Sequence, residues 1–311
     1  MIKLIWGRLL ELVPVVLLMS LVAFLLIHLV PGDPARATLP QTATPQQIEA
    51  RREQLGLNRP LFEQYFDFVK GAVVLDFGRS TGTREEVRSL IARRAIPSLL
   101  LVAYSVLVMM VIAVPLGVLA AVRRGRLTDQ LIRLMSTVTM VMPAFWLAIL
   151  LVILVSVKLG WLPTSGYGDT FGEHIVSLTL PAITMGLALF PVIMRLLRSS
   201  MIETMQKEYI EAARARGLSQ TRVMFKHVLR NSATSSIAVM GLLLGILLSA
   251  TVFVEQVFAI PGLGSLLVSA VQQRDFPLVQ ALTLLFGIAM VLSSLLSDVI
   301  LGALDPRVRL T

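Results

Sequence analysis

Side chains that commonly carry out chemistry are few in this sequence and lie far apart. The chain has no cysteine, which excludes thiolate metal sites, thiol catalysis and disulfides. Its three histidines, His28, His174 and His227, match no metal-ligand spacing, so we expect structural or interfacial roles for them. The chain also lacks any Gly-Lys pair, and therefore any glycine-rich phosphate loop. We expect no resident cofactor and no enzymatic activity in this chain.

One acidic residue and several hydroxyl groups remain as candidates for contact with a bound molecule. Glu255 follows an apolar run and would face the outer side, where it could attract a peptide amine or a metal cation, or pair with Arg274. Hydroxyl groups within the apolar runs could line a pathway or form helix-to-helix hydrogen bonds. These are Ser105, Ser136, Thr137, Thr139, Ser249 and Thr251. Glu255 is the candidate for a substrate contact at the outer mouth.

The composition points to a bilayer as the surroundings of these residues. The 311 residues are 56% hydrophobic and 15% charged, with a mean hydropathy of +0.80. A hydrocarbon core of about 30 Å needs about 20 apolar residues in a helix. Six runs meet or nearly meet that length, which predicts an all-α polytopic membrane protein. They cover residues 9–30, 95–122, 134–157, 175–194, 232–254 and 276–304.

Prolines interrupt several of these runs, and each is expected to kink its helix. They are Pro14, Pro97, Pro115, Pro143, Pro181 and Pro191. The first run also imitates a secretory signal, since Lys3 and Arg8 precede it and Ala35-Arg36-Ala37 follows. It is longer than a signal core of about 7 to 15 residues, so we expect a retained helix.

The basic residues predict the orientation of the spans. With the N-terminus inside, the short inner loops and the two ends hold sixteen Lys and Arg, whereas the short outer loops hold two, Lys158 and Arg274. Cytoplasmic loops carry such an excess, so both termini are predicted to be cytoplasmic. The net charge of +9 then reflects loops that face anionic lipid, and no nucleic-acid partner is expected.

Two soluble segments are long enough to fold on their own. The outer segment, residues 31–94, should contain one helix that starts at Thr44-Pro45 and ends near Gly56, and another after Pro60. In that second helix the apolar residues form one stripe, namely Leu61, Tyr65, Phe68 and Val69. We expect a small helical cap packed on the bundle, which could also meet a delivery protein or gate the outer mouth.

In the inner segment, residues 195–231, the residue pattern predicts a helix, a turn and a second helix between Glu208 and Asn231. Ala212, Ala213 and Ala215 favour a first helix, and Gly217 suits the left-handed conformation that ends it. Ser219 is placed to cap a second helix that runs to Leu229. Small residues at 212, 213 and 217 would let another protein approach the backbone closely, while arginines at 214, 216 and 222 bind its acidic rim. The pattern indicates a docking element.

These residues resemble the loop of ABC importer permeases, which has Glu-Ala-Ala, three residues and then Gly. Here the matching residues are Glu211, Ala212, Ala213 and Gly217. The ending HVLRN at 227–231 replaces the general Leu-Pro pattern and resembles the dipeptide, oligopeptide and nickel branch. Further motifs in the order of that branch are PGDP at 31–34, LGLNRP at 55–60, FG at 77–78, RSSM at 198–201, PGLG at 261–264, RDFPLVQ at 274–280 and DPR at 305–307.

The resemblance implies the fold, partners and site residues of a type I ABC importer permease. It implies six transmembrane helices, divided into an N-terminal helix at 1–30, an extracytoplasmic region at 31–94 and a five-helix core at 95–311. Coupling to an ATPase would use Glu211, Ala212, Ala213 and Gly217, with Arg214 and Arg216 at the rim. The implied partners are a second homologous permease, two ATP-binding cassette subunits that bind ATP and Mg, an extracytoplasmic substrate-binding protein and the lipid of a bacterial inner membrane.

The substrate stays open at this point. The resemblance favours import of dipeptides or oligopeptides, and relatives with this pattern also handle glutathione or nickel. A self-contained ion-coupled carrier or channel is the alternative from another class. Such carriers usually bury ionisable groups near the membrane midplane, whereas the four middle runs here have no charged residue.

Overall fold

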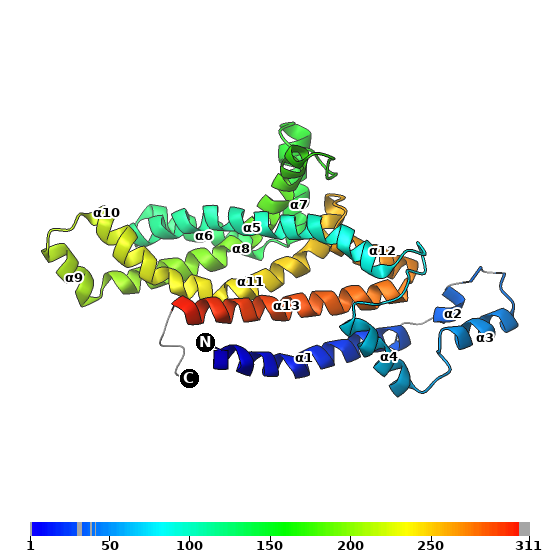
Figure 1. The fold of residues 1–311 in the computed structure, drawn as a ribbon. Coiled ribbons are helices and arrows are strands. Elements are labelled where there is room, and N and C mark those ends of the chain that lie inside the picture. Colours follow the sequence, from blue (N-terminus) through cyan, green and yellow to red (C-terminus); the bar gives the residue numbers. More distant parts are fainter. Residues whose placement is uncertain (1, 30–32, 38, 41, 305–311) are drawn as a thin grey trace.

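The computed structural model describes residues 2–29, 33–37, 39–40 and 42–304, and this part of the chain is almost entirely helical (Figure 1). Arg79 and Glu86 form an isolated antiparallel β-bridge. The elements are α1 (Ile2–Leu29), α2 (Pro34–Ala37), α3 (Pro45–Gln54), α4 (Leu61–Val73), α5 (Val87–Val122), α6 (Leu127–Val141), α7 (Ala144–Leu151), η1 (Val152–Lys158), α8 (Phe171–Met205), α9 (Glu208–Ala215), α10 (Gln220–Arg222), η2 (Val223–Leu229), α11 (Arg230–Val257), α12 (Leu263–Gln273) and α13 (Phe276–Leu304).

The long helices α1, α5, α8, α11 and α13 lie side by side and form the body of the molecule (Figure 1). The inner segment, with α9 and α10, protrudes at one end, and α2, α3, α4 and α12 lie toward the other. The first turns of α1 and the last turns of α13 both lie toward the end that holds α9, so the described chain starts and ends on the same side of the bundle. This placement agrees with an even number of membrane crossings.

Some of the expected spans are continuous helices in the structure and others are not. Within the described residues, α5, α8, α11 with the helical turns before it, and α13 are each long and apolar enough to cross a membrane. In α1 an apolar stretch covers Leu12–Leu25, and the expected end of this span at Val30 lies outside the described residues. The span expected from residue 95 begins earlier, because α5 starts at Val87.

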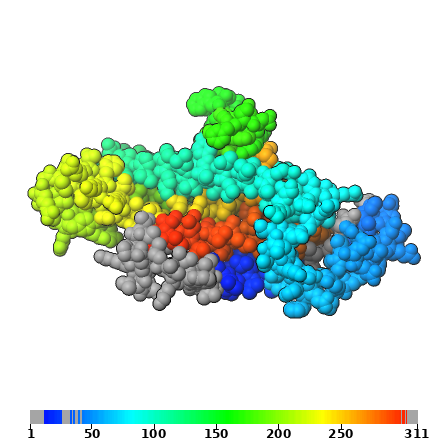
Figure 2. Space-filling view, viewed as in Figure 1, coloured from blue at the N-terminus to red at the C-terminus, as the bar shows by residue number. Residues whose placement is uncertain are grey.

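The third expected span, 134–157, is wrong as a single kinked helix. The chain bends by 106° between α6 and the α7–η1 helix. Pro143 has no backbone N–H and disfavours a helical residue before it, and Met142 is accordingly extended, with φ −72° and ψ 126°. Beyond the bend, α7 and η1 project from the body of the molecule (Figures 1 and 2).

The outer segment has the two expected helices. Thr44 caps α3 through a reciprocal pair of hydrogen bonds with Gln47, and Gly56 follows the helix with φ +67°. From α4, Tyr65 and Phe68 pack against Phe24 of α1 at ring-centre distances of 5.5 and 6.1 Å. The expected cap therefore rests on the first helix.

The hydroxyl groups within the spans mostly bond within their own helices. Ser105, for example, donates to the carbonyl of Leu101 at 2.7 Å, and Thr251 donates to that of Leu248 at 2.6 Å. Ser136, Thr137, Thr139 and Ser249 likewise donate to carbonyls three or four residues earlier. Such bonds satisfy the hydroxyl locally. The expected helix-to-helix bonds are present for two of these residues, since Ser105 also bonds to the Met185 sulfur of α8 at 3.6 Å and Thr137 accepts a bond from Arg195 of α8. For the other four, the hydrogen bonds found stay within one helix.

Candidate functional site

The inner segment folds as the sequence predicts, with one change of helix type. α9 ends at Ala215, and Gly217 takes the left-handed conformation with φ +76°. A side chain at that φ would strain the backbone, so glycine fits the turn. Ser219 stands at the start of α10 but its side chain makes no capping bond. The second helix continues as a π-helical stretch, η2, directly into α11.

The residues of the Glu-Ala-Ala pattern are divided between the two faces of α9. Glu211, Ala212, Arg214, Arg216 and Gly217 are exposed at the end of the molecule. Ala213 departs from the expected docking surface. It is only 9% exposed and packs inward beside the fully buried Ile210. Its small side chain therefore brings α9 close to the chain's own core instead of opening a surface to a partner.

A compact apolar core ties the inner segment to the long helices. Its members include Leu197 and Met201 of α8, Ile210 of α9, and Val223 and Val228 of η2. Polar contacts add to this core, since the Thr204 hydroxyl accepts a bond from Ser232 at 3.1 Å. Asn231 donates to the Tyr209 hydroxyl at 3.1 Å. A displacement of α9 would therefore be passed to both α8 and α11.

At the other end of α11, Glu255 is completely buried. Its carboxylate accepts hydrogen bonds from the hydroxyl of Ser98 in α5 and from the backbone N–H of Ser265 at 3.0 Å. Ser98 in turn accepts from the N–H of Leu263 at 2.7 Å. Arg274, the expected alternative partner, is exposed and lies at the far end of α12. That ion pair is absent from the described residues, and Glu255 has no surface open to a substrate in this conformation.

The start of α12 explains how a carboxylate can be buried without an ion pair. The amides at the N-terminus of a helix carry partial positive charge and favour an anion. Gly262 precedes α12, and a Cβ atom there would collide with the Glu255 carboxylate. The PGLG motif therefore provides the close approach between this helix start and Glu255. Ser98 gave no signal in the sequence, since it lies 157 residues away from its partner.

A second buried carboxylate, also missed by the sequence analysis, joins the outer segment to the core. Asp275 is 1% exposed and precedes α13. It accepts hydrogen bonds from the Ser80 hydroxyl and from the N–H groups of Thr81, at 3.1 Å, and Gly82, at 3.3 Å. The RDFPLVQ motif thus holds the loop before α5 in place.

The histidines do not form a metal site in the described residues. No group of three or more potential ligands was found there. His174 stacks on Tyr167, with ring centres 4.0 Å apart, and its Nδ1 lies 3.0 Å from the Tyr167 carbonyl. His227 lies in η2, and the side chain of His28 lies outside the described part.

A bundle of membrane-length helices, with a helix–turn–helix protruding at one end, defines a polytopic membrane protein. The chain belongs to the binding-protein-dependent transport system inner membrane components, since residues 113–310 match that family's model. Residues 1–97 match the model of the family's N-terminal region. The chain is thus a multi-pass inner membrane protein and a permease subunit of an ABC importer.

Relatives and solved structures agree with this assignment. The chain is 40% identical over 302 residues to the glutathione transport system permease protein GsiC of Escherichia coli K12, and 97% of each chain is covered. The GsiC protein of Shigella flexneri serotype 5b gives the same identity and coverage. Two inward-facing structures of the MetNI methionine ABC transporter match with TM-scores of 0.55 and 0.57. At 20% identity, with 70% of this chain and 96% of that chain covered, they show a shared fold.

Proposed function

We propose that this permease imports short peptides, with glutathione as the first substrate to test. The observation that supports this substrate class is the 40% identity, over 97% of both chains, to permeases named for glutathione transport. Glutathione is a tripeptide, so it lies within the peptide class that the HVLRN ending suggests. Dipeptides, longer peptides and nickel are the alternatives of the same branch.

The proposed partners follow from the family. A second homologous permease would complete the pathway, two ATP-binding cassette subunits would supply the energy, and an extracytoplasmic binding protein would deliver the substrate. The excess of Lys and Arg at the end that holds α9 supports a cytoplasmic inner segment and cytoplasmic termini.

The exposed face of α9 is the proposed contact with the ATPase. Glu211, Ala212, Arg214, Arg216 and Gly217 present two arginines and an acid around a small alanine and a glycine. The core beneath them would pass movements of the ATPase into α8 and α11, and so shift the bundle between outward-open and inward-open states. ATP hydrolysis belongs, in this proposal, to the partner subunits.

Reconstitution tests the substrate. The permease pair, the ATPase subunits and the cognate binding protein would be placed in liposomes with ATP on the cytoplasmic side. We expect ATP-dependent uptake of labelled glutathione, competed by unlabelled glutathione. Faster uptake of a dipeptide or of Ni²⁺, with glutathione inactive, would rule out the glutathione assignment, and uptake without any ATPase would support the ion-coupled alternative.

The coupling surface has a matched test in the same system. Glu211→Lys should abolish transport while the protein still inserts, since it places a cation where an acid faces the partner. Glu203→Lys makes the same charge change on α8, at a residue with 76% exposure outside α9, and should transport normally. Equal transport by both variants would remove Glu211 from the coupling surface.

A further inference from the structure

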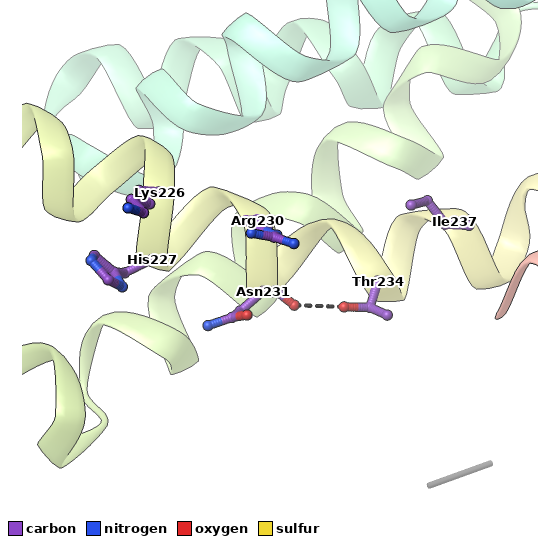
Figure 3. Close-up of a pocket in the computed structure, with 6 residues that line it drawn as sticks. All are labelled: Lys226, His227, Arg230, Asn231, Thr234 and Ile237. Atoms are coloured by element: carbon purple, nitrogen blue, oxygen red, sulfur yellow. Dashed lines mark hydrogen bonds between the residues drawn. The ribbon is translucent and has the colours of Figure 1, made fainter. Parts of the chain in front are cut away.

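A basic cavity lies beside the inner segment, and apart from Asn231 its lining residues have no assigned role in the proposed coupling. It has a volume of about 450 Å³ and opens along η2 and the start of α11. Figure 3 shows its lining side chains following one another along these helices. They are Lys226, His227, Arg230, Asn231, Thr234 and Ile237.

The polarity of the lining changes in one direction. Lys226, His227 and Arg230 lie at one end, and Ile237 lies about 10 Å beyond Arg230 along α11. Thr234, between them, donates its hydroxyl to the carbonyl of Asn231 at 2.7 Å. Among the described residues, none of the three basic side chains is paired with an acid. The cavity thus offers three basic side chains at one end and an apolar side chain at the other.

The cavity lies on the side of α11 that faces away from α8. Ser232 and Ser235 bond to Thr204 and Ser200 of α8 and so mark the covered face. Beyond the cavity α11 meets α13, since the backbone carbonyls of Ile237 and Ala238 accept bonds from Ser297 at 3.3 and 3.0 Å. The cavity therefore lies beside the start of this α11–α13 seam, at the end of the bundle that holds α9. At this level a transmembrane bundle leaves the hydrocarbon and meets the lipid headgroups.

From this arrangement we infer that the cavity binds the phosphate headgroup of an anionic phospholipid of the cytoplasmic leaflet. The phosphate would lie against Lys226 and Arg230, and an acyl chain would follow the seam past Ile237. Basic pockets between transmembrane helices on the cytoplasmic side are suited to such headgroups. A soluble anion or an acidic protein surface would use the cationic end but would gain nothing from the apolar end. The inference depends on the orientation proposed above and not on the identity of the substrate.

Native mass spectrometry of the full chain in detergent tests the inference. Dioleoyl phosphatidylglycerol should bind more tightly than dioleoyl phosphatidylcholine, which has the same acyl chains and no net charge. The double variant Lys226→Gln, Arg230→Gln should weaken binding of phosphatidylglycerol about tenfold, since each basic residue near the surface contributes to attraction of anionic lipid. Inorganic phosphate should compete weakly because it has no acyl chain.

A control variant makes the same charge change elsewhere. Arg124→Gln with Arg126→Gln removes two exposed charges from the loop between α5 and α6, outside the cavity, and should weaken binding of phosphatidylglycerol much less than the cavity variant does. Equal loss of phosphatidylglycerol from both double variants would overturn the site, and so would phosphate binding as tightly as the lipid. Unchanged lipid binding with loss of the ATPase subunits from the purified complex would instead assign these residues to a protein partner. Because lipid binding is measured without transport, failure of the glutathione test would not affect this result.

Discussion

Arg198 of α8 donates two parallel hydrogen bonds to the carboxylate of Asp129 in α6. Its Nε donates to Oδ1 at 2.8 Å and its Nη2 donates to Oδ2 at 2.7 Å. Asp129 also accepts from the N–H of Gly125 at 2.9 Å, in the turn that follows α5. The pair therefore joins α6 and the turn between α5 and α6 to the last part of α8, before the chain enters α9.

Removing either member of this pair should destabilise the protein. Asp129 is 1% exposed and Arg198 is 19% exposed, so Asp129→Asn leaves the Arg198 charge largely buried without its acidic partner. Arg198→Gln leaves the buried Asp129 with the half-exposed Arg133, at 3.5 Å, as its remaining cationic partner. The expected loss is about 3–5 kcal/mol. Thermal unfolding of the detergent-solubilised variants measures it, and the double variant should lose less than the sum of the single losses.

Arg133 provides the control for that experiment. It approaches Asp129 at 3.5 Å but is 52% exposed, so Arg133→Gln should cost about 1 kcal/mol or less. If Arg198→Gln proves as mild as Arg133→Gln, the bidentate pair contributes little to stability.

Substitutions of Gly217 should separate backbone strain from surface bulk. Gly217→Val forces a β-branched residue to φ +76° and should lower stability by about 1–2 kcal/mol. Gly217→Asn tolerates that conformation better and should keep stability close to wild type, while adding bulk to the proposed ATPase contact. Unfolding temperature and ATP-driven uptake, measured on the same preparations, give the two readouts. Normal uptake by Gly217→Asn would show that this turn accommodates bulk.

Truncation of Glu255 should loosen the packing between α5, α11 and α12. Glu255→Ala leaves the Ser98 hydroxyl and the Ser265 N–H without their acceptor, at an expected cost of about 1–3 kcal/mol. Glu255→Gln keeps one acceptor oxygen and should lose less. Gln256→Ala, which removes one long bond of 3.3 Å from an exposed side chain, is the matched control for thermal unfolding. A Glu255→Ala variant as stable as the control would contradict the role of the buried carboxylate.

Loss of Asp275 should release the loop before α5. In Asp275→Ala the Ser80 hydroxyl and the N–H groups of Thr81 and Gly82 lose their shared acceptor. Amide hydrogen exchange in residues 79–86 should become about tenfold faster, while α4 keeps its protection. Asp76→Ala removes an exposed carboxylate that accepts one bond, from Gly78 at 3.0 Å, and should change exchange only near Gly78. Unaltered exchange after loss of Asp275 would mean that other contacts hold this loop.

The sequence predicted those features that depend on neighbouring residues. The start of α3 after Thr44, the end of α9 before Gly217 and the second helix up to Leu229 each involve residues a few positions apart, so local chemistry determines them. The apolar stripe of α4 also predicted the helix face that meets Phe24. The family motifs then identified the class of transporter.

Features that depend on distant residues could not be predicted in the same way. Pro143 accompanies a 106° bend, whereas Pro97 and Pro115 lie inside the continuous helix α5, and nothing in the residue type distinguishes these outcomes. The packing of the rest of the chain decides between a kink and a break. Likewise, the sequence suggested that Glu255 is exposed, whereas it is buried by contacts with Ser98 and the start of α12. Those contacts form only in the folded chain, so the sequence near Glu255 could not predict them.

α8 is one of the helices that are longer than the hydrocarbon core of a membrane requires. Its 35 residues would extend about 52 Å, against a hydrocarbon core of about 30 Å. It starts at the Thr170 cap and ends where the chain enters α9, and neither Pro181 nor Pro191 interrupts it. One continuous helix therefore connects the two compartments, and we expect a displacement at one of its ends to be transmitted to the other.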